Sequence, residues 1–447
     1  MFPQERPSTS IQGSRGTSKW TFYKHVDSNC ATSQEGITAQ QPEGGRIANI
    51  GIVTKKRTWR FRKPILIITL VVSLICLGAI GRVGWIAGSS PRNHVMGQLH
   101  YLDSALDRGA ARSMQGLFPE GEFFTWVLTG VAAGRVANDP SYSPEEQAFA
   151  RYLAERTLFG LDDPSLIHRF GDIPELDHGI FYRGWRLTLL NEIGAWDEKV
   201  HTQAQQEARE ILRAVDDSTS GWVDSYPNQA WPCDTVVGLG AAKVAAPEEA
   251  APVISRWLDR IDHAIDPDTG LLAHSVDHSG VAREPARGSS QSIIATFWPL
   301  ITDDTGYWAT YSKNFVTTRL GIVGVREYPG GHGRGDVDSG PLIFGMSPSA
   351  SAVTQAAARA HGDITLATSL DKEIELLGIP WGSDKERTYL FGAMPVAVGF
   401  FVWADTTPLG TEIPTQAPRP TWFIVSIILA LPAALMWGVA FLFRRRV

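Results

Sequence analysis

The sequence predicts an all-α fold, an (α/α)6 barrel built from six helical hairpins and flanked by two transmembrane helices. Three observations support this prediction. A long apolar run lies near each end of the 447-residue chain. Between them the pattern indicates helix after helix, without the long alternating runs that a large sheet would need. The connections between these helices alternate between short and long, as they do in a ring of hairpins.

The two apolar runs qualify as membrane spans at residues 64–88 and 421–443. Pro64 to Gly81 contains no charge, and Trp422 to Phe443 contains 22 uncharged, mostly apolar residues. A helix needs about 20 such residues to cross the hydrocarbon core. Arg82 lies near the far end of the first run, where its side chain can reach the interface, and membrane helices tolerate a proline such as Pro432.

Basic residues flank both spans on their outer sides. Six Lys and Arg residues between 55 and 63 precede the first span, and Arg444 to Arg446 follow the second. Positively charged flanks stay in the cytoplasm. We therefore expect a two-pass protein of the cytoplasmic membrane, with both termini cytoplasmic and residues 89–420 outside. A cleaved signal peptide would not have 63 residues before its apolar region.

The sequence between and around the spans divides into further regions. Residues 1–63 are predicted to be a disordered cytoplasmic tail ending in a basic collar, because residues 1–54 are rich in Ser, Thr, Gln and Gly and lack a hydrophobic period. Residues 89–403 form the predicted extracytoplasmic barrel. Residues 404–420, with four prolines, are a linker, and 444–447 are a basic cytoplasmic end.

The charge is distributed unevenly along the chain. Residues 1–63 hold 11 Lys and Arg against 4 Asp and Glu, which gives +7, and Arg82 with the three terminal arginines adds +4. Because the whole chain is at −6, the remainder is at −17. An acidic outer domain argues against a nucleic-acid partner, and the basic ends favour contact with lipid headgroups of the bilayer. Cys233 is the single cysteine of that domain, so no disulfide can form within it.

Twelve helices are expected in the outer domain, and several have recognisable starts. Ser143-Pro-Glu-Glu combines a cap residue, a proline in the first turn and acids. Pro247-Glu-Glu precedes an apolar stripe at helical spacing. An open helical solenoid is the structural alternative, but no fixed-period repeat supports it. The expected ranges are 96–110, 119–137, 144–159, 179–194, 200–215, 234–245, 248–264, 289–301, 304–322, 342–361, 364–378 and 388–403.

The stretch from Gly221 to Asp234 is the first candidate for a site on the long connections. Asp224 could act as an acid or base and Tyr226 as a donor. Asn228 and Trp231 would contact a ligand. Cys233 is either a nucleophile or a packed apolar thiol, and no histidine lies near it in sequence to activate it.

Two further loops contain polar side chains of interest. His274 and His278 have a spacing that suits zinc on a helix, but no matching acid or thiol accompanies them, so we expect no metal site. The segment Gly330 to Gly340 combines five glycines with His332, Asp336 and Asp338. Two close carboxylates would share one proton. A phosphate loop is excluded here, because no strand is expected before the segment and no Gly-Lys-Ser/Thr follows it.

These residues, taken in order, resemble one known family. Tyr182-Arg-Gly184, then Pro227-Asn-Gln-Ala-Trp-Pro-Cys-Asp234, then Asp266-Pro-Asp-Thr-Gly270 and Asp336-Val-Asp-Ser-Gly340 are similar to the linalool dehydratase/isomerase family over roughly residues 115–365. The resemblance implies an (α/α)6 barrel and a cofactor-free acid/base enzyme that moves water and a double bond. Two positions depart from the family, because Asp224 stands at a family cysteine and Trp185 at a family histidine, whereas Cys233 matches the second family cysteine.

The resulting hypothesis is a lyase or isomerase that acts, without cofactor or metal, on a small apolar alcohol or alkene drawn from the membrane. Asp224 would be the leading acid or base, and Asp336 or Asp338 its partner. Tyr182 and Tyr226 would orient a hydroxyl, and Trp185 and Trp231 would wall the pocket. Arg183, Asn228, His274 and His332 complete the expected binding set. A glycan-active six-hairpin enzyme and a non-catalytic binding domain are the alternatives, and the oligomeric state is left open.

Overall fold

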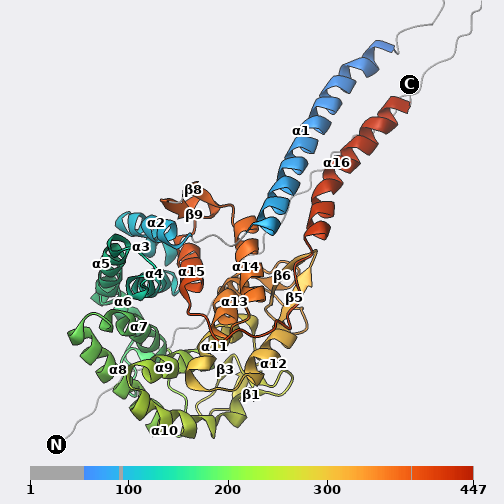
Figure 1. Cartoon of the computed structure of the whole chain (residues 1–447). Coiled ribbons are helices and arrows are strands. Elements are labelled where there is room, and N and C mark those ends of the chain that lie inside the picture. Colours follow the sequence, from blue (N-terminus) through green and yellow to red (C-terminus); the bar gives the residue numbers. More distant parts are fainter. Residues whose placement is uncertain (1–54, 90–93, 384, 446–447) are drawn as a thin grey trace, which may run out of the picture. The chain divides into compact units, whose positions relative to one another are not determined.

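The structure, a computed structural model, describes residues 55–89, 94–383 and 385–445. The expected disordered tail, residues 1–54, lies outside these ranges. The chain divides into two units, Met1–Thr58 and Trp59–Val447, and the description below concerns the second. This unit is mostly helical, with a few short strands, as the sequence predicted (Figure 1).

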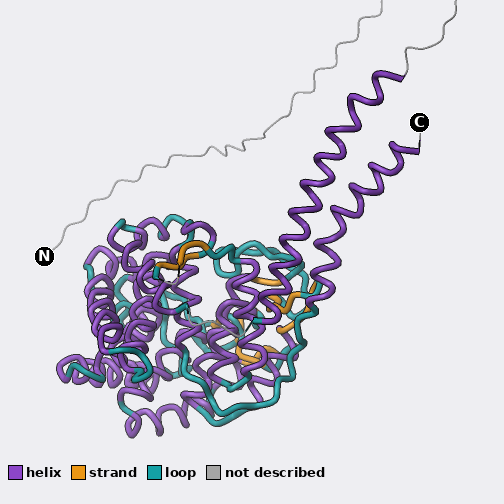
Figure 2. The backbone as a smooth tube through the Cα atoms, turned by 45° about the horizontal axis from the view of Figure 1, so that its top comes forward, coloured by secondary structure: helices purple, strands orange, loops and turns teal. Residues whose placement is uncertain are grey.

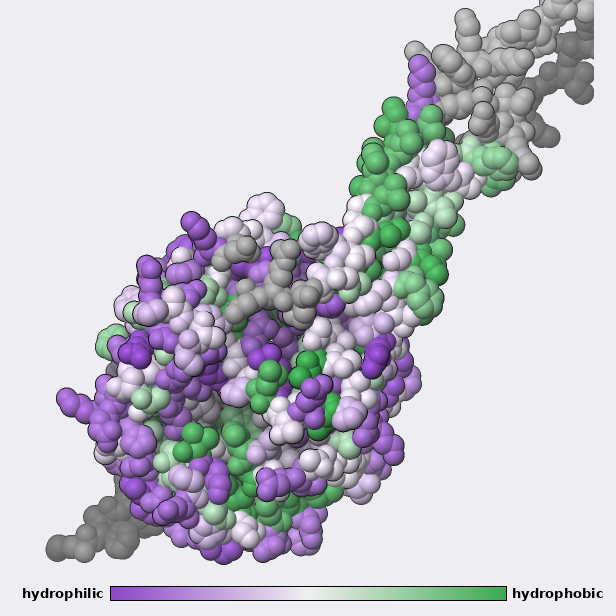
Figure 3. Space-filling view, in the orientation of Figure 1, coloured by the Kyte–Doolittle hydropathy of each residue, from purple (hydrophilic) through white to green (hydrophobic). Residues whose placement is uncertain are grey.

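Two long apolar helices correspond to the predicted spans. Helix α1 covers Lys55–Gly88 and helix α16 covers Trp422–Arg445. Their segments Lys63–Gly88 and Trp422–Leu442 are long and apolar enough to cross a membrane. The two helices lie side by side, and the Trp437 indole donates a 3.0 Å hydrogen bond to Ser73. Hydrophobic residues make up much of the surface of these two helices, whereas hydrophilic residues are more frequent on the domain face in this view, which also has some hydrophobic areas (Figure 3).

Six helices of the outer domain contact one another in a closed series, which we call the inner circuit (Figures 1 and 2). Each packs against the next in chain order, and the last packs against the first. The six are α4 (Gly121–Asn138), α7 (Gly179–Gly194), α9 (Pro232–Ala245), α11 (Gly288–Ile301), α13 (Pro348–Ala360) and α15 (Pro395–Thr406).

A second set of helices packs on the inner circuit. Helix α5 contacts α4, α8 contacts α7 and α9, α10 contacts α8 and α9, α12 contacts α11, α14 contacts α13, and α2 contacts α15. Their bounds are α2 (Val95–Asp107), α5 (Pro144–Leu161), α8 (Glu198–Asp217), α10 (Pro247–Leu258), α12 (Gly306–Phe315) and α14 (Ile364–Leu377), with short helices α3 (Ala110–Met114) and α6 (Pro164–Ile167) between. Ser143 forms the expected capping box at the start of α5.

Four small antiparallel sheets interrupt the helices within the described ranges. β1 (Ile265–Asp266) pairs with β2 (Leu271–Leu272), and β3 (Ser275–Val276) pairs with β4 (Ala282–Glu284). β5 (Val316–Arg319), β6 (Ile322–Arg326) and β7 (Met346–Ser347) form a three-stranded sheet in which Val316 faces Val325. β8 (Trp381–Ser383) pairs with β9 (Glu386–Thr388).

Several expected boundaries were wrong. The helix expected over 304–322 ends at Phe315, because the β-branched run Val316-Thr-Thr pairs as β5 instead. The helix expected over 342–361 begins at Pro348, where the Ser347 hydroxyl accepts from the Ala350 N–H. A strand, β6, does precede the glycine-rich segment, contrary to expectation. Residues 404–406 belong to α15 rather than to a linker.

The rest of the expected linker is bound to the domain instead of lying free. Gly410 N donates to Arg359 O at 2.9 Å and Ile413 N donates to Gly362 O at 3.0 Å. Thr421 N, directly before α16, donates to Gly321 O at 2.8 Å. These backbone bonds attach the chain to the domain along most of its path to α16.

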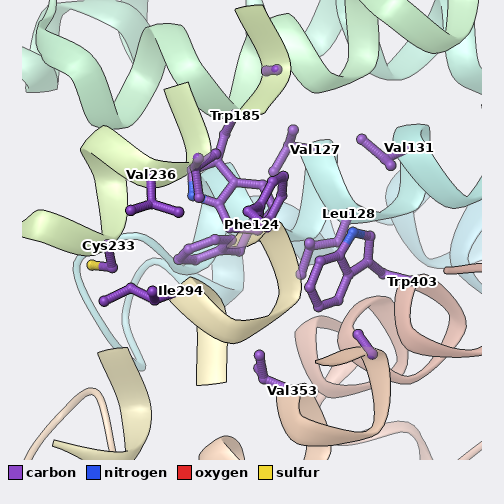
Figure 4. Close-up of a cluster of buried hydrophobic side chains, with 14 of the residues drawn as sticks. Phe124, Val127, Leu128, Val131, Trp185, Cys233, Val236, Ile294, Val353 and Trp403 are labelled. Carbon is purple, nitrogen blue, oxygen red and sulfur yellow. The ribbon is translucent and has the colours of Figure 1, made fainter. Parts of the chain in front are cut away.

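Large aromatic side chains fill the middle of the inner circuit (Figure 4). Trp185 of α7 is fully buried, with ring centroids 5.4 Å from Phe124 and Phe297 and 5.7 Å from Trp403. Edge-to-face aromatic pairs of this kind add about 0.5–1.5 kcal/mol each beyond the area they bury. The middle of the circuit is therefore a packed core, and any site must lie at one of its ends.

Candidate functional site

The first residues of several inner helices gather at one end of the circuit. The Tyr226 hydroxyl, in the loop before α9, donates to Glu120 Oε1 directly before α4 at 2.8 Å. Charges on Glu120 and Asp338 both act on the Asp234 carboxyl in the first turn of α9. Asp338 is held by Ser349, at the start of α13, which donates to its carbonyl at 2.6 Å. We call Glu120, Tyr226, Cys233, Asp234 and Asp338 the acidic cluster.

Asp234 is the buried member of the acidic cluster. Its residue is 5% exposed, and the Cys233 thiol donates to its Oδ1 at 3.6 Å. Burial is the main cause that raises its pKa, to about 7, and the charges of Glu120 and Asp338 add to this effect. Hydrogen bonds from Ser225 and Cys233 act in the opposite direction. Near neutral pH this carboxyl is therefore divided between its protonated and ionised forms.

Glu120 and Tyr226 form a hydrogen-bonded pair beside Asp234. Burial raises the pKa of Glu120, the Tyr226 hydroxyl lowers it, and the charge of Asp338 raises it. Burial and then Glu120 raise the pKa of Tyr226, so it remains a phenol that donates. The Tyr226 ring stacks on Phe181 at 5.6 Å and meets Trp231 edge-on at 5.6 Å. The pair thus has aromatic surfaces on two sides.

Asp336 and Asp338 have different environments although they are two residues apart. Arg287 Nη2 donates to Asp336 Oδ2 at 2.5 Å, and Ser339 donates to Asp336 Oδ1 from its backbone N at 3.1 Å. Desolvation would raise the pKa of Asp336, but the bonds from Ser339 and Arg287 lower it. Asp338 is exposed on one side. Protein atoms around its carboxyl and then the charge of Asp336 raise its pKa.

Arg287 joins this loop to the start of α11. Its Nε donates to Oε1 of the fully buried Glu327 at 2.8 Å, and Glu327 also accepts from the Ser289 hydroxyl at 2.8 Å. His274 Nε2 lies 3.5 Å from Arg287 Nη1. Burial and then the arginine charge lower the His274 pKa to about 4, so this histidine is neutral at pH 7. His332 is exposed on the glycine-rich segment.

Tyr182 and Arg183 lie away from the acidic cluster, in contacts between inner and outer helices. The Tyr182 hydroxyl donates to Leu161 O at 3.3 Å. Arg183 donates to Glu207 at 3.0 Å and Glu210 at 2.5 Å, both on α8. The Tyr-Arg-Gly motif thus joins α7 to its neighbours. Trp185 belongs to the central core, and its indole N–H has no hydrogen-bond partner among the described residues.

The Asp224 carboxylate is bound within its own loop, and among the described residues no hydrogen bond or ion pair joins it to Asp336 or Asp338, which we expected it to meet. Its Oδ2 accepts the N–H of Asn228 at 2.7 Å, and Asn228 has φ +64°. The carboxylate therefore closes a turn, as Asx side chains do. Asp224, Asn228 and Arg183 line a cavity of about 880 Å³ that neither Asp336 nor Asp338 lines. Asp234, ten positions later in the sequence, is instead the acid of this stretch that lies near Asp338.

Two other features lie outside the acidic cluster. A cavity of about 740 Å³ lies where α4, α7, α13 and α15 end, and Arg135, Gln355, Arg359 and Asp405 are among its lining residues. Among the described residues, the one group with geometry suited to a metal ion is Asp172, Asp177 and His178, whose ligand atoms lie within 4.8 Å of one another. Neither feature contains a member of the cluster.

Sequence reasoning missed four charged residues of this end: Glu120, Asp234, Arg287 and Glu327. Asp234 lay within the stretch already singled out, and its place in a first helical turn after Trp-Pro-Cys was the available signal. Glu120 had no such signal, because its partner Tyr226 is 106 residues away. Neither a protein-family model nor a curated protein sequence matches this chain.

Proposed function

We propose that this chain is a membrane-anchored, cofactor-free acid/base enzyme, a lyase or isomerase that acts on a small apolar alcohol or alkene. The observation that supports this most is the acidic cluster. Three carboxyls with raised pKa values, Glu120, Asp234 and Asp338, gather with a tyrosine and a thiol at one end of the inner circuit. Groups with shifted pKa values concentrate where proteins do chemistry.

The architecture we propose for the outer domain is the (α/α)6 barrel. The closed inner circuit and the packing of an outer helix on each of its members support it. In such a barrel, long connections meet at one end. The acidic cluster draws on two of them, the segments 218–231 and 327–345, together with the first turns of inner helices. This placement suits a substrate site.

The proposed orientation puts this domain outside the cytoplasmic membrane. The two apolar helices support anchoring, and the basic residues that flank each of them in the sequence support cytoplasmic termini. An apolar substrate partitions into the bilayer, so an enzyme anchored there encounters it at high local concentration.

The proposed chemistry divides two proton transfers between two carboxyls. Protonated Asp234 gives its proton to the substrate hydroxyl, the C–O bond breaks and water leaves. Ionised Glu120 takes a proton from the adjacent carbon, and the electrons of that C–H bond form the double bond. Asp234 ends ionised and Glu120 protonated, and one proton transfer from Glu120 back to Asp234 restores the starting state. General acid/base catalysis needs pKa values near the working pH, which Asp234 has.

The neighbouring side chains have supporting roles in this proposal. Tyr226, whose hydroxyl is bound to Glu120, orients the substrate oxygen. Phe181 and Trp231 pack on Tyr226 and provide the apolar walls. Burial and the charge of Asp234 raise the pKa of Cys233 well above its ordinary value, so it acts as a packed thiol rather than as a nucleophile.

The test uses the full chain in detergent or nanodiscs with a panel of C5–C10 tertiary and allylic alcohols and the matching alkenes. Products are measured by headspace gas chromatography. We expect dehydration or isomerisation of at least one compound by the wild type, and a loss of 100-fold or more in Asp234→Asn and Glu120→Gln. Asp224→Asn is the matched control and should stay within about threefold of the wild type.

Two outcomes would overturn the proposal. Turnover that survives in both Asp234→Asn and Glu120→Gln would show that the acidic cluster is not the catalytic site. Hydrolysis of aryl glycosides in a parallel panel, lost in Asp234→Asn, would assign the same carboxyls to glycan chemistry instead.

A further inference from the structure

Two hydrogen bonds fix how α14 runs along the end of α1. Lys372 Nζ donates to Ala87 O at 2.9 Å, and Arg82 Nη2 donates to Glu375 O at 2.5 Å. Moving from Lys372 to Glu375 along α14 thus corresponds to moving from Ala87 back to Arg82 along α1. The C-terminal end of α14 is therefore directed toward the uncharged run of α1, which ends at Gly81.

The other apolar helix has a similar neighbour. The turn between β5 and β6 meets the first turn of α16, where Thr421 N donates to Gly321 O. A Cβ on Gly321 would lie 3.0 Å from Val425 and 3.2 Å from Ile424. This turn is therefore level with the start of the apolar segment Trp422–Leu442.

At both places large apolar side chains are exposed. Leu377 is the last residue of α14, and Ile379 comes two residues later. Trp381 is in β8 and Phe391 comes three residues after β9, and the centroids of these two rings are 5.7 Å apart. Leu320 is exposed at the β5–β6 turn. Trp381 and Phe391 are 62% and 67% exposed, which is unusual for aromatic side chains facing water. We call Leu320, Leu377, Ile379, Trp381 and Phe391 the apolar shelf.

The backbone conformation of three shelf residues also indicates that the exposure of their side chains has a function. Leu320, Ile379 and Phe391 have φ of +52°, +48° and +57°. Residues with a Cβ rarely adopt this left-handed region, and for bulky or β-branched side chains it is strained. These strained residues keep large apolar side chains on the surface, where the side chains gain no stability from burial within the domain. Exposed Arg319 directly precedes Leu320, and exposed Lys385 lies in the turn between β8 and β9. Both suit a headgroup layer.

We infer that the apolar shelf is a lipid-binding surface that inserts into the outer headgroup and acyl boundary of the bilayer, beside the two spans. Aromatic residues favour this boundary on both faces of the bilayer. The inference rests on the proposed membrane anchoring. It adds that the domain is fixed against the membrane by its own surface, so its orientation does not depend on the two helices alone.

The test measures the membrane depth of spin labels on the full chain in liposomes of phosphatidylcholine and phosphatidylglycerol. The background variant has Cys30→Ser, Cys76→Ser and Cys233→Ser. Single cysteines are then introduced as Trp381→Cys, Phe391→Cys and Leu377→Cys and are labelled. Collision with oxygen, which concentrates in lipid, is compared with collision with a water-soluble nickel chelate. We expect all three labels to collide at least threefold more with oxygen than with nickel, relative to a water-exposed label.

The matched water-exposed control is Phe159→Cys, an exposed aromatic on α5, a helix that packs against α2, α4 and α7. Leu74→Cys and Leu435→Cys, on exposed faces of α1 and α16, report the spans themselves. If these two labels are buried in lipid while those at 377, 381 and 391 match the one at 159, the shelf inference is wrong and the spans stand. If Leu74→Cys and Leu435→Cys are also accessible to nickel, the anchoring fails and the inference with it.

If one shelf variant does not fold, labels at the other shelf positions can still be measured. Leu320→Cys lies in a separate turn, on the α16 side. Each labelled protein is accepted only if it elutes as the background variant does in size-exclusion chromatography. A lipid-embedded label at 320 supports the inference, and a water-exposed one at 320 contradicts it.

Discussion

The Tyr226 hydroxyl donates a 2.8 Å hydrogen bond to Glu120 Oε1, between residues 106 positions apart. This bond joins the loop before α9 to the start of α4. It places a donor next to a carboxyl whose pKa is raised by burial. With Asp234 and Asp338 it defines the end of the inner circuit at which proton chemistry is proposed.

The pH dependence of turnover should follow Asp234. Its pKa is raised to about 7, so the carboxyl is protonated below that pH and ionised above it. If it donates a proton to the leaving hydroxyl, kcat/KM falls tenfold per pH unit above about 7. The profile is measured from pH 5 to 9 with the substrate found in the panel. An activity that rises through pH 7 and stays high would assign Asp234 the role of base instead.

Replacing Cys233 should leave most of the activity. The thiol donates to Asp234 Oδ1, and burial with the neighbouring carboxylate keeps it protonated. Cys233→Ser retains a donor of similar size, so we expect kcat/KM within about fivefold of the wild type. Loss of all turnover in a folded Cys233→Ser protein would show that the thiol reacts covalently.

Glu373 should make the domain less stable at alkaline pH. It is 4% exposed and accepts the Val323 N–H, and burial raises its pKa from 4.5 to about 8. The folded state thus binds its proton more tightly than the unfolded state. Its contribution to stability is full below about pH 4.5 and is lost as the pH rises through about 8.

Glu373→Gln should therefore raise the unfolding temperature at pH 9 relative to the wild type and change it little at pH 5. A difference on the order of 3 kcal/mol between the two pH values corresponds to a shift of this size. Thermal unfolding in detergent measures it, with the exposed Glu175→Gln as control. Equal pH dependence in wild type and variant would contradict the assignment.

Gly184 should not tolerate a side chain. A Cβ there would lie 3.0 Å from Cα and N of Gly238, where α7 and α9 approach each other. Gly184→Ala forces two inner helices apart, and overpacking of this kind costs about 1–3 kcal/mol. Gly330→Ala is the control, since a Cβ there meets nothing within 4 Å. Similar unfolding temperatures for the two variants would mean that the helices separate easily.

Both termini should be cytoplasmic. The prediction follows from the basic residues before α1 and after the apolar part of α16. An impermeant protease applied to intact cells should leave a C-terminal tag intact and cleave the domain between the spans. Removal of the tag from unlysed cells would show that the C-terminus is outside and would contradict the predicted topology.

The sequence by itself determined the features that depend on neighbouring residues. Apolar length predicted two helices long enough to cross a membrane, and α1 and α16 include the expected residues. Helical periodicity and caps gave most of the helices, such as α5 with its Ser143 box. One exception is Val316, where the chain forms the β5–β6 hairpin instead of continuing α12, and helical periodicity does not reveal that pairing.

Only the tertiary structure decided which charged groups meet. Asp224 and Asp234 are both acids of one loop and helix start, but the first closes a turn with Asn228 while the second is buried. Burial and the charges of Glu120 and Asp338 raise the pKa of Asp234, and distant segments of the chain supply both. Glu120 joins Tyr226 across 106 residues for the same reason. Likewise, Leu377 and Trp381 become candidates for lipid contact only because Lys372 and Arg82 hold α14 along α1.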